Sequence, residues 1–171
     1  MTSAFIQDSF RYTGSRSFPL KQFLSNHAVR YLFFLRQQNP AARLCRRHMQ
    51  TKYGLEIGNG NNIGPGLYLG HAHSITVNPR ARLGKNCNLH KGVTIGQENR
   101  GKRIGAPVIG DNVWVGTNAV VVGGITVGDN VLIAPNAFVN QDIPPNSIVI
   151  GNPARIIPSP DATLGYINNP I

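Results

Sequence analysis

Cysteine, acidic side chains and long apolar runs are scarce in this sequence, and each scarcity excludes a class of protein. The 171 residues contain two cysteines, Cys45 and Cys87, which are too few for a disulfide framework. No charged start followed by an apolar stretch and a small-residue cleavage site marks a secretory signal, so we expect a cytoplasmic protein. The longest nearly uncharged apolar run, Tyr31 to Leu35, is far shorter than the roughly 20 residues that cross a bilayer, which excludes a spanning helix.

The few acidic residues leave a strong positive charge, and that charge is concentrated near the start of the sequence. The chain has 17 Lys and Arg against 7 Asp and Glu, a net charge of +10. Residues 1–53 carry nine basic residues against Asp8 alone, whereas residues 54–171 carry eight against six. A basic segment of this kind suits a membrane surface, a polyanion or the phosphates of a cofactor, and it equally suits a solvated helical face.

Aromatic residues are also few, at 8% of the chain, while the hydrophobic share is 41% and there are 19 glycines and 12 prolines. This composition favours many short strands closed by turns around small aliphatic side chains, and it argues against a helical bundle. The length suits one domain with a modest appendage.

A six-residue repeat organises most of the chain. Aliphatic residues recur at steps of six in three groups: Ile57, Ile63 and Leu69; Val77, Leu83, Leu89 and Ile95; Ile109, Val115, Val121, Val127, Ile133 and Val139. Glycine follows eight of these thirteen residues, and the position four after each is usually small or aliphatic. An α-helix would turn the side chain by about 600° over six residues and place it on the opposite face each time. A unit of one short strand and one bend keeps it inward, and three units close a triangular coil, so we predict an all-β parallel β-helix.

Two steps depart from six and mark places for function. The step from Leu69 to Val77 is eight residues, which adds two residues beside His71. The step from Ile95 to Ile109 is fourteen, which predicts an extruded loop over residues 97–107. Such irregular segments on a rigid scaffold are where binding and catalytic residues concentrate.

The ends of the chain lie outside the repeat. Two helices are predicted, Asn26 to Gln38 and Ala41 to Lys52, separated at Pro40 and ending before Gly54. We expect them to cap the first coil, whose apolar end and strand edges would otherwise be exposed. The predicted division is an N-terminal α-helical segment (1–53), a β-helix domain (54–157) and an irregular C-terminal tail (158–171).

The repeat region resembles a known family. The segments that carry the resemblance are GLYLGHAHSITVNPRARLGKNCNLHKGVTIG, NRGKR, APVIGDNVWVGTNAVVVGGITVGDN and DIPPNSIVIGNPARII. They are similar to the serine acetyltransferase branch of the hexapeptide acyltransferases, above all to its short members associated with exopolysaccharide and colanic acid synthesis. The resemblance covers residues 54–157 and implies a left-handed coil.

The resemblance implies a general base, because the family uses a histidine of the coil turn at the position of His71. An alcohol is almost wholly protonated near pH 7, and an imidazole titrates in the range needed to take its proton during attack on a thioester. The family also places an acid fifteen residues earlier, at the position of Glu56. Fifteen residues is nearly one coil, so we expect Glu56 to lie about one layer below His71 and to orient its imidazole.

The residues that would hold free serine are less complete. The family has an Asp directly before the histidine and an Arg-His pair before the proline of the loop, whereas this sequence has Gly70 and Gly105-Ala106. Each hydrogen bond to a charged group contributes roughly 1.5 to 3 kcal/mol, so their loss puts serine in doubt as the acceptor. His73 and His90 are candidate replacements for acceptor binding; the alternatives are a subunit interface for His73 and a surface corner for His90.

The co-substrate implied by the resemblance is acetyl-CoA, whose pantetheine arm the family threads along a prism edge. By family position the contacts are Gly96, Thr117 and Pro135. Arg155, Lys102 and Arg103 are candidates for binding the phosphates, with a solvated loop as the alternative for the last two. We expect no metal, because His71, His73 and His90 lack the spacing of the three zinc ligands in gamma-class carbonic anhydrases, which share this fold.

Two functions remain open from the sequence. The first is an acetyl-CoA-dependent O-acetyltransferase acting on serine or, more in keeping with the missing contacts, on a sugar hydroxyl of a polysaccharide precursor. The second is a non-catalytic hexapeptide-repeat protein with a binding or structural role. We expect a homotrimer, because a convex prism has little pocket of its own, with the ring of Trp114 turned outward into the trimer contact. The basic helices favour membrane proximity slightly, and no nucleic acid is expected as a partner.

Overall fold

Helices form the front of the chain and short strands form the rest in a computed structural model, which describes residues 3–37, 39–57 and 62–171. The helices of these residues are α1 (Ser3–Thr13), α2 (Leu20–Ser25), α3 (His27–Leu35) and α4 (Pro40–Tyr53). The predicted helices correspond to α3 and α4, but α3 ends earlier than expected, at Leu35, and its predicted end at Gln38 lies outside the described residues. The sequence reading missed α1 and α2.

The ends of α3 and α4 are set by their capping residues. The Asn26 side chain accepts a hydrogen bond from the Ala28 amide, and Asn39 does the same for Ala42. These oxygens satisfy amides that have no partner inside the helix. Helix α4 ends at Gly54, which has a φ of 65° and so adopts the left-handed conformation that glycine tolerates. The chain turns there and enters the first strand.

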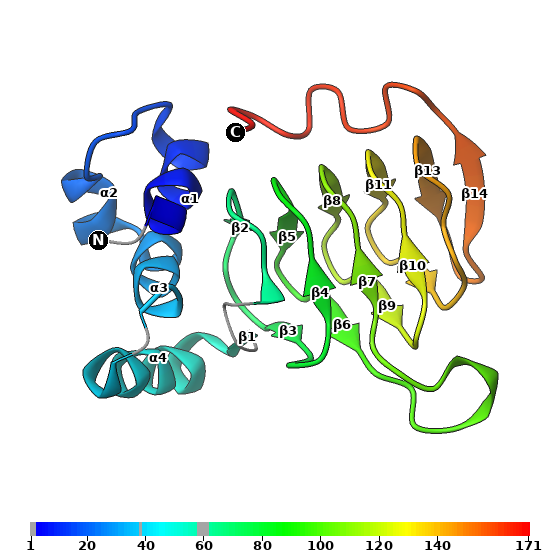
Figure 1. Cartoon of the computed structure of the whole chain (residues 1–171), viewed down its shortest axis with the longest axis horizontal. Coiled ribbons are helices and arrows are strands. Elements are labelled where there is room, and N and C mark those ends of the chain that lie inside the picture. The colour runs from blue at the N-terminus through cyan, green and yellow to red at the C-terminus, as the bar shows by residue number, and fades with distance from the viewer. Residues whose placement is uncertain (1–2, 38, 58–61) are drawn as a thin grey trace.

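Three sheets form the faces of a solenoid, and all of their strands pair in parallel except the last strand of the chain (Figure 1). The five-stranded sheet contains β1 (Leu55–Ile57), β3 (Ile75–Val77), β6 (Thr94–Gly96), β9 (Val120–Val122) and β12 (Phe138–Val139). The three-stranded sheet contains β4 (Arg82–Leu83), β7 (Val108–Ile109) and β10 (Thr126–Val127). The six-stranded sheet contains β2 (Tyr68–Gly70), β5 (Asn88–His90), β8 (Val113–Val115), β11 (Val131–Ile133), β13 (Ser147–Ile150) and β14 (Arg155–Pro158).

The register of these sheets follows from the six-residue repeat. Leu132 pairs with Trp114, and Thr94 with Val120, so that each strand lies on the equivalent strand of the neighbouring coil. The aliphatic residue of each step points inward, and Leu89, Val115 and Ile133 are fully buried. Burying a side chain of this size stabilises the fold by about 1.5 to 3 kcal/mol. The prediction of a parallel β-helix with a short N-terminal helical region is confirmed.

Asparagines support one corner of the coils. Asn86, Asn112, Asn130 and Asn146 all have positive φ, between 54° and 57°, a conformation that asparagine adopts more readily than most residues. Their side chains bond in pairs between neighbouring coils, with Asn86 donating to Asn112 over 3.1 Å and Asn130 donating to Asn146 over 2.8 Å. These bonds satisfy side-chain amide groups at the corner that would otherwise lack a protein partner.

A buried ion pair attaches the helices to the first coil. Arg36 at the end of α3 contacts Asp8 of α1 with 2.8 Å between Nε and Oδ2, and Arg36 also donates to the carbonyl of Ile63. Asp8 accepts a hydrogen bond from the Leu67 amide in return. Arg11 is buried as well and donates to the carbonyl of Gly66. Some of the basic residues of the N-terminal segment therefore make internal contacts. The two expected roles, an anion-binding surface and a solvated helical face, do not describe these residues.

The loop over residues 97–107 and the C-terminal tail both lie outside the prism. Residues 97–107 form a loop with the 3-10 helix η2 (Gly101–Arg103), and it projects from the solenoid below β9 in Figure 1. After β14, which pairs antiparallel with β13, the chain returns along the solenoid toward the helices. Arg11 donates to the carbonyl of Asn168, which attaches this tail to α1. None of the described helices is long and apolar enough to cross a membrane.

Candidate functional site

His71 lies in a tight turn between β2 and β3, where the two extra residues enter the repeat. His71 has a φ of 50° and Ser74 a φ of 53°, and both side chains are exposed. For residues other than glycine, such sparsely populated backbone conformations cost about 1 to 3 kcal/mol of stability, and they persist only where the surroundings impose them. The Ser74 amide donates to the Tyr53 carbonyl over 2.8 Å, and the Gly92 amide donates to the His73 carbonyl over 3.1 Å. The turn is thus a built feature of the coil.

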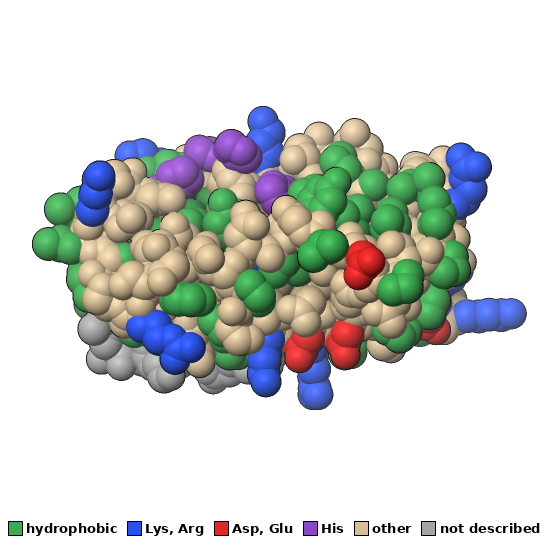
Figure 2. All heavy atoms as spheres, turned by 90° about the horizontal axis from the view of Figure 1, so that it is seen from above, with side chains coloured by type: hydrophobic (Ala, Val, Ile, Leu, Met, Phe, Trp, Pro, Cys, Tyr) green, Lys and Arg blue, Asp and Glu red, His purple; other side chains and the backbone are tan. Residues whose placement is uncertain are grey.

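The turn opens onto a pocket of about 800 Å³ that runs along one edge of the solenoid. Its lining residues are His71, His73, Ser74, Lys91, Gly92, Thr117 and Asn118. They come from the same corner of successive coils, and none is acidic. Figure 2 shows histidine side chains gathered near the junction of the helices and the solenoid, away from the acidic residues visible on that face. The structure therefore places Thr117, a predicted co-substrate contact, in the pocket of the predicted base.

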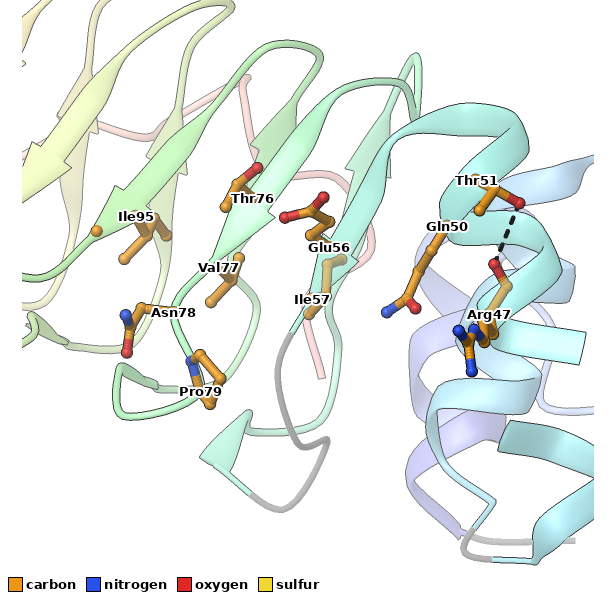
Figure 3. A pocket seen from close by; sticks show the side chains of 11 residues that line it. Arg47, Gln50, Thr51, Glu56, Ile57, Thr76, Val77, Asn78, Pro79 and Ile95 are labelled. Carbon is orange, nitrogen blue, oxygen red and sulfur yellow. Dashed lines mark hydrogen bonds between the residues drawn. The ribbon is translucent and has the colours of Figure 1, made fainter. Parts of the chain in front are cut away.

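Glu56 lines a different pocket. It lies in the middle of β1, pairs in register with Thr76 and is exposed. The pocket there has a volume of about 610 Å³ and lies between α4 and the five-stranded sheet, with Arg47 and Gln50 on the helical side (Figure 3). No hydrogen bond joins Glu56 to His71 among the described residues of this single chain. Their predicted pairing stays a prediction.

His90 is half-buried on β5 and stands over Gly70. Gly70 pairs in register with His90, and a Cβ built on Gly70 would lie 2.5 Å from the His90 Nδ1. The imidazole therefore fills the space that a side chain at position 70 would need. The alternative of a surface histidine at a corner is wrong, because the ring lies on the sheet with its centroid 4.7 Å from that of Trp114.

The surroundings of His90 disfavour the protonated form of its ring. Burial lowers the pKa of His90 below the usual 6.5, and the neighbouring imidazole of His71 contributes in the same direction. The Nε2 atom is buried and has no hydrogen-bond partner within the described part of the chain. His90 lines a cavity of about 460 Å³ between α1, the six-stranded sheet and the tail, and Tyr12 and Tyr68 line the same cavity. Tyr12 and Tyr68 also line the neighbouring cavity that His71 borders.

The ring of Trp114 faces outward from the sheet, as its strand position predicts. The structure shows what covers it within one chain: Tyr166 of the tail lies 5.1 Å away between ring centroids. The expectation that Trp114 meets a neighbouring subunit did not include this tail, because the tail has no periodic signal. Contact with another chain stays a prediction.

The other predicted co-substrate residues are dispersed. Gly96 lines the pocket of Glu56, and Pro135 is exposed at the next corner, where the Gly116 backbone packs closely against it. Lys102 and Arg103 lie on η2, and Arg103 donates to the carbonyl of Asn140. Arg155 is exposed at the start of β14. One chain alone does not gather these residues around His71.

Two site residues were missed by the sequence reading. Lys91 lines the His71 pocket, and its only sequence signal is its place at the same corner of the next coil. His27 contacts the His71 turn from α3, 45 residues away along the chain, and no sequence pattern links the two. No group of three or more His, Cys, Asp or Glu that could hold a metal ion occurs within the described ranges.

Comparison with known proteins supports one family. Residues 106–141 match the family described as bacterial transferase hexapeptide (six repeats). The chain is 37% identical over 139 residues to serine acetyltransferase 1, chloroplastic, of Arabidopsis thaliana, an alignment that covers 80% of this chain and 44% of the relative. It is 32% identical over 142 residues to the serine acetyltransferase of Staphylococcus xylosus, covering 82% of this chain and 65% of the relative. The chain thus spans about half to two thirds of the length of these relatives.

Solved structures agree with this result. Serine acetyltransferase of Neisseria gonorrhoeae in complex with serine superposes with a TM-score of 0.67 at 27% identity, covering 90% of this chain and 67% of that one. The apoenzyme of soybean serine acetyltransferase superposes with the same TM-score at 25% identity, covering 91% and 67%. The similarity includes the helical end as well as the solenoid, because it covers most of the chain.

Proposed function

Because this chain belongs to the bacterial hexapeptide transferases and is serine acetyltransferase-like, we propose that it is an acetyl-CoA-dependent O-acetyltransferase with His71 as general base. The observation that carries the proposal is the His71 turn. An exposed imidazole on a strained two-residue insertion borders a pocket that continues along a solenoid edge to Thr117. The relatives that share most of this chain are named serine acetyltransferases, which supports the reaction class.

The reaction needs one proton to move twice. The His71 imidazole takes the proton of the acceptor hydroxyl while the oxygen attacks the thioester carbonyl of acetyl-CoA. The resulting tetrahedral intermediate collapses, the carbon–sulfur bond breaks, and the imidazolium returns the proton to the leaving thiolate. The products are an acetyl ester and free CoA. Glu56 is proposed to orient the imidazole, a role in which its loss lowers turnover less than the loss of His71.

The edge pocket is the proposed place of the acetyl-CoA arm. Thr117 lines this pocket, and Pro135 stands at the next corner, so the arm would pass from His71 toward the later coils. Lys91 adds a positive charge beside the pocket. Gly96, Lys102, Arg103 and Arg155 lie on other parts of the surface, and we propose that they contact the co-substrate only where neighbouring prisms meet.

A homotrimer would provide such meeting places. In a closed assembly the edge that carries His71 faces the surface of another copy, and the open pocket becomes a cleft. The dispersion of the proposed co-substrate residues over one chain supports this arrangement. Membrane proximity through the exposed basic side chains of the helices stays a prediction.

The acceptor is either serine or a sugar hydroxyl. The names of the relatives support serine, and one neighbouring structure is described as a complex with serine. None of these relatives supports a sugar. The sugar hypothesis rests on Gly70, Gly105 and Ala106, which offer no charged group to an amino acid, and on the basic and neutral lining of the His71 pocket.

A thiol-release assay with acetyl-CoA tests the function and the acceptor together. Serine and a panel of sugar precursors are compared by kcat/KM, with free cysteine as a competitor at the serine site. We expect acetyl transfer, a weak KM for serine, poor inhibition by cysteine and a higher kcat/KM for a sugar. A serine kcat/KM within about tenfold of 10⁸ M⁻¹s⁻¹, near the diffusion limit, together with tight cysteine inhibition would make serine the acceptor. Absence of release with every acceptor would favour the alternative of a non-catalytic repeat protein.

A further inference from the structure

We infer that His27 is a positioning residue, which holds the turn that carries His71 and thereby sets the orientation of the base. The catalytic effect of this contact rests on the proposed function, whereas the contact between His27 and the turn is a feature of the fold. His27 is the first residue of α3, far from the repeat in sequence.

The side chain of His27 bonds to the backbone next to His71. Its Nε2 lies 2.9 Å from the carbonyl oxygen of Ala72, the residue that directly follows the base. A carbonyl oxygen only accepts hydrogen bonds, so Nε2 of His27 carries a proton. Ala72 is buried, and its carbonyl therefore depends on a protein donor. The donor is fixed in place because Asn26 caps the helix at the preceding residue.

Aromatic packing makes this contact rigid. The His27 ring is stacked on Tyr53 with 4.3 Å between centroids, and the edge of the His73 ring packs against both, at 4.8 and 5.4 Å. Tyr53 ends α4, and its carbonyl accepts the Ser74 amide. Gly54 packs directly against Ser74, since a Cβ there would lie 3.2 Å from the Ser74 Cα. The start of α3 and the end of α4 thus contact the turn on both sides of His73.

These contacts from α3 and α4 account for the strained conformation of the turn. His71 and Ser74 both have positive φ, and neither is glycine or asparagine. Such residues relax unless several contacts oppose relaxation. The Gly92 amide holds the turn from the coil, while His27 and Tyr53 hold it from the helices. Loss of the His27 donor releases the Ala72 carbonyl and frees the peptide that joins Ala72 to His73, one residue after the base.

The expected effect is on the chemical step. A displacement of a catalytic group by about 1 Å costs on the order of 100-fold in rate. Thr117 and Lys91 border the pocket from other coils and are not held by His27. Loss of the donor should therefore lower kcat and leave the KM for acetyl-CoA nearly unchanged.

Three variants separate the hydrogen bond from the packing. His27→Phe keeps a ring on Tyr53 but has no donor, and His27→Gln restores an N–H donor without the ring. His48→Phe is the matched control, because His48 is an exposed histidine of α4. We expect kcat to fall about 10- to 100-fold in His27→Phe, to recover several-fold in His27→Gln relative to His27→Phe, and to stay at the wild-type value in His48→Phe.

Hydrogen–deuterium exchange provides a readout that needs no activity. We expect the amides of residues 72–74 to exchange faster in His27→Phe than in the wild type and the His48→Phe control. Wild-type kcat in His27→Phe, or unchanged exchange in the turn, would overturn the inference, as would a fall in kcat that His27→Gln does not relieve. If the wild-type protein transfers no acetyl group, the proposed function fails, and exchange alone decides whether His27 holds the turn.

Discussion

His90 and Gly70 illustrate how one side chain determines what its neighbour can be. The imidazole of His90 occupies the space above Gly70, so a larger residue at position 70 would collide with it. The sequence reading treated the two positions separately, as a missing acceptor contact and a candidate replacement. The structure links them, since they are register partners on adjacent coils. An aspartate at position 70 would fit only if the His90 ring moved away or were replaced by a smaller side chain.

His90 should also make stability depend on pH. Burial holds its pKa below the usual 6.5, so below that pH the unfolded chain binds more protons than the folded one. The free energy of unfolding is then highest above pH 6.5 and falls as the pH is lowered through that value. We expect the Tm of the wild type to fall more steeply between pH 7 and 5 than the Tm of His90→Gln. Parallel Tm profiles for the two proteins would show that His90 is not the group responsible.

At the residue scale, the sequence predicts those site residues that lie where the six-residue spacing is interrupted. The eight-residue step identified the His71 turn, because an insertion into a strict repeat must leave the prism. His27 could not be found in this way, since its bond to Ala72 joins segments 45 residues apart. Glu56 has the expected sequence separation from His71, yet it lines another pocket, because β1 belongs to the five-stranded sheet whereas His71 lies in the turn that follows β2 of the six-stranded sheet.

At the scale of elements, the six-residue pattern predicted the strands well. Each inward aliphatic residue has a register partner one coil away, so local sequence and sheet pairing agree. Helices α1 and α2 and the antiparallel pairing of β14 with β13 were not predicted. These elements depend on contacts between distant residues, such as Asp8 with Arg36, that leave no periodic signal.

The helical segment has a second role in this account. Helices were expected to cap the first coil, which is a matter of burying apolar ends. The structure shows that α3 and α4 also contact the turn that carries His71. A helical element expected only to cap a coil can thus contribute to the geometry of a site, and its length alone does not reveal this.

For the whole molecule, the three-part division of the chain stays a prediction. Arg11 of α1 donates to Gly66 in the first coil and to Asn168 in the tail, so helices, solenoid and tail share contacts. The tail also covers Trp114 on the six-stranded sheet. Cooperative unfolding of all three parts is consistent with these contacts.

Assembly is the main prediction at this scale. The open pockets of a single prism and the dispersed co-substrate residues lead us to expect a homotrimer. Static light scattering should give a mass about three times the 18.6 kDa of one chain. A mass equal to a single chain at micromolar concentration would contradict the trimer and, with it, a site built between subunits.

His71 is the proposed base of an acetyl-CoA-dependent O-acetyltransferase, and the turnover of His71→Ala tests this claim most directly. The measurement compares kcat of the wild type, His71→Ala and the exposed control His48→Ala, using the best acceptor, with acetyl-CoA binding followed by calorimetry. Because a general base acts only in the chemical step, we predict that kcat falls by about 10² to 10⁴ in His71→Ala while acetyl-CoA binding and the control are unchanged. Wild-type kcat in His71→Ala would contradict the claim.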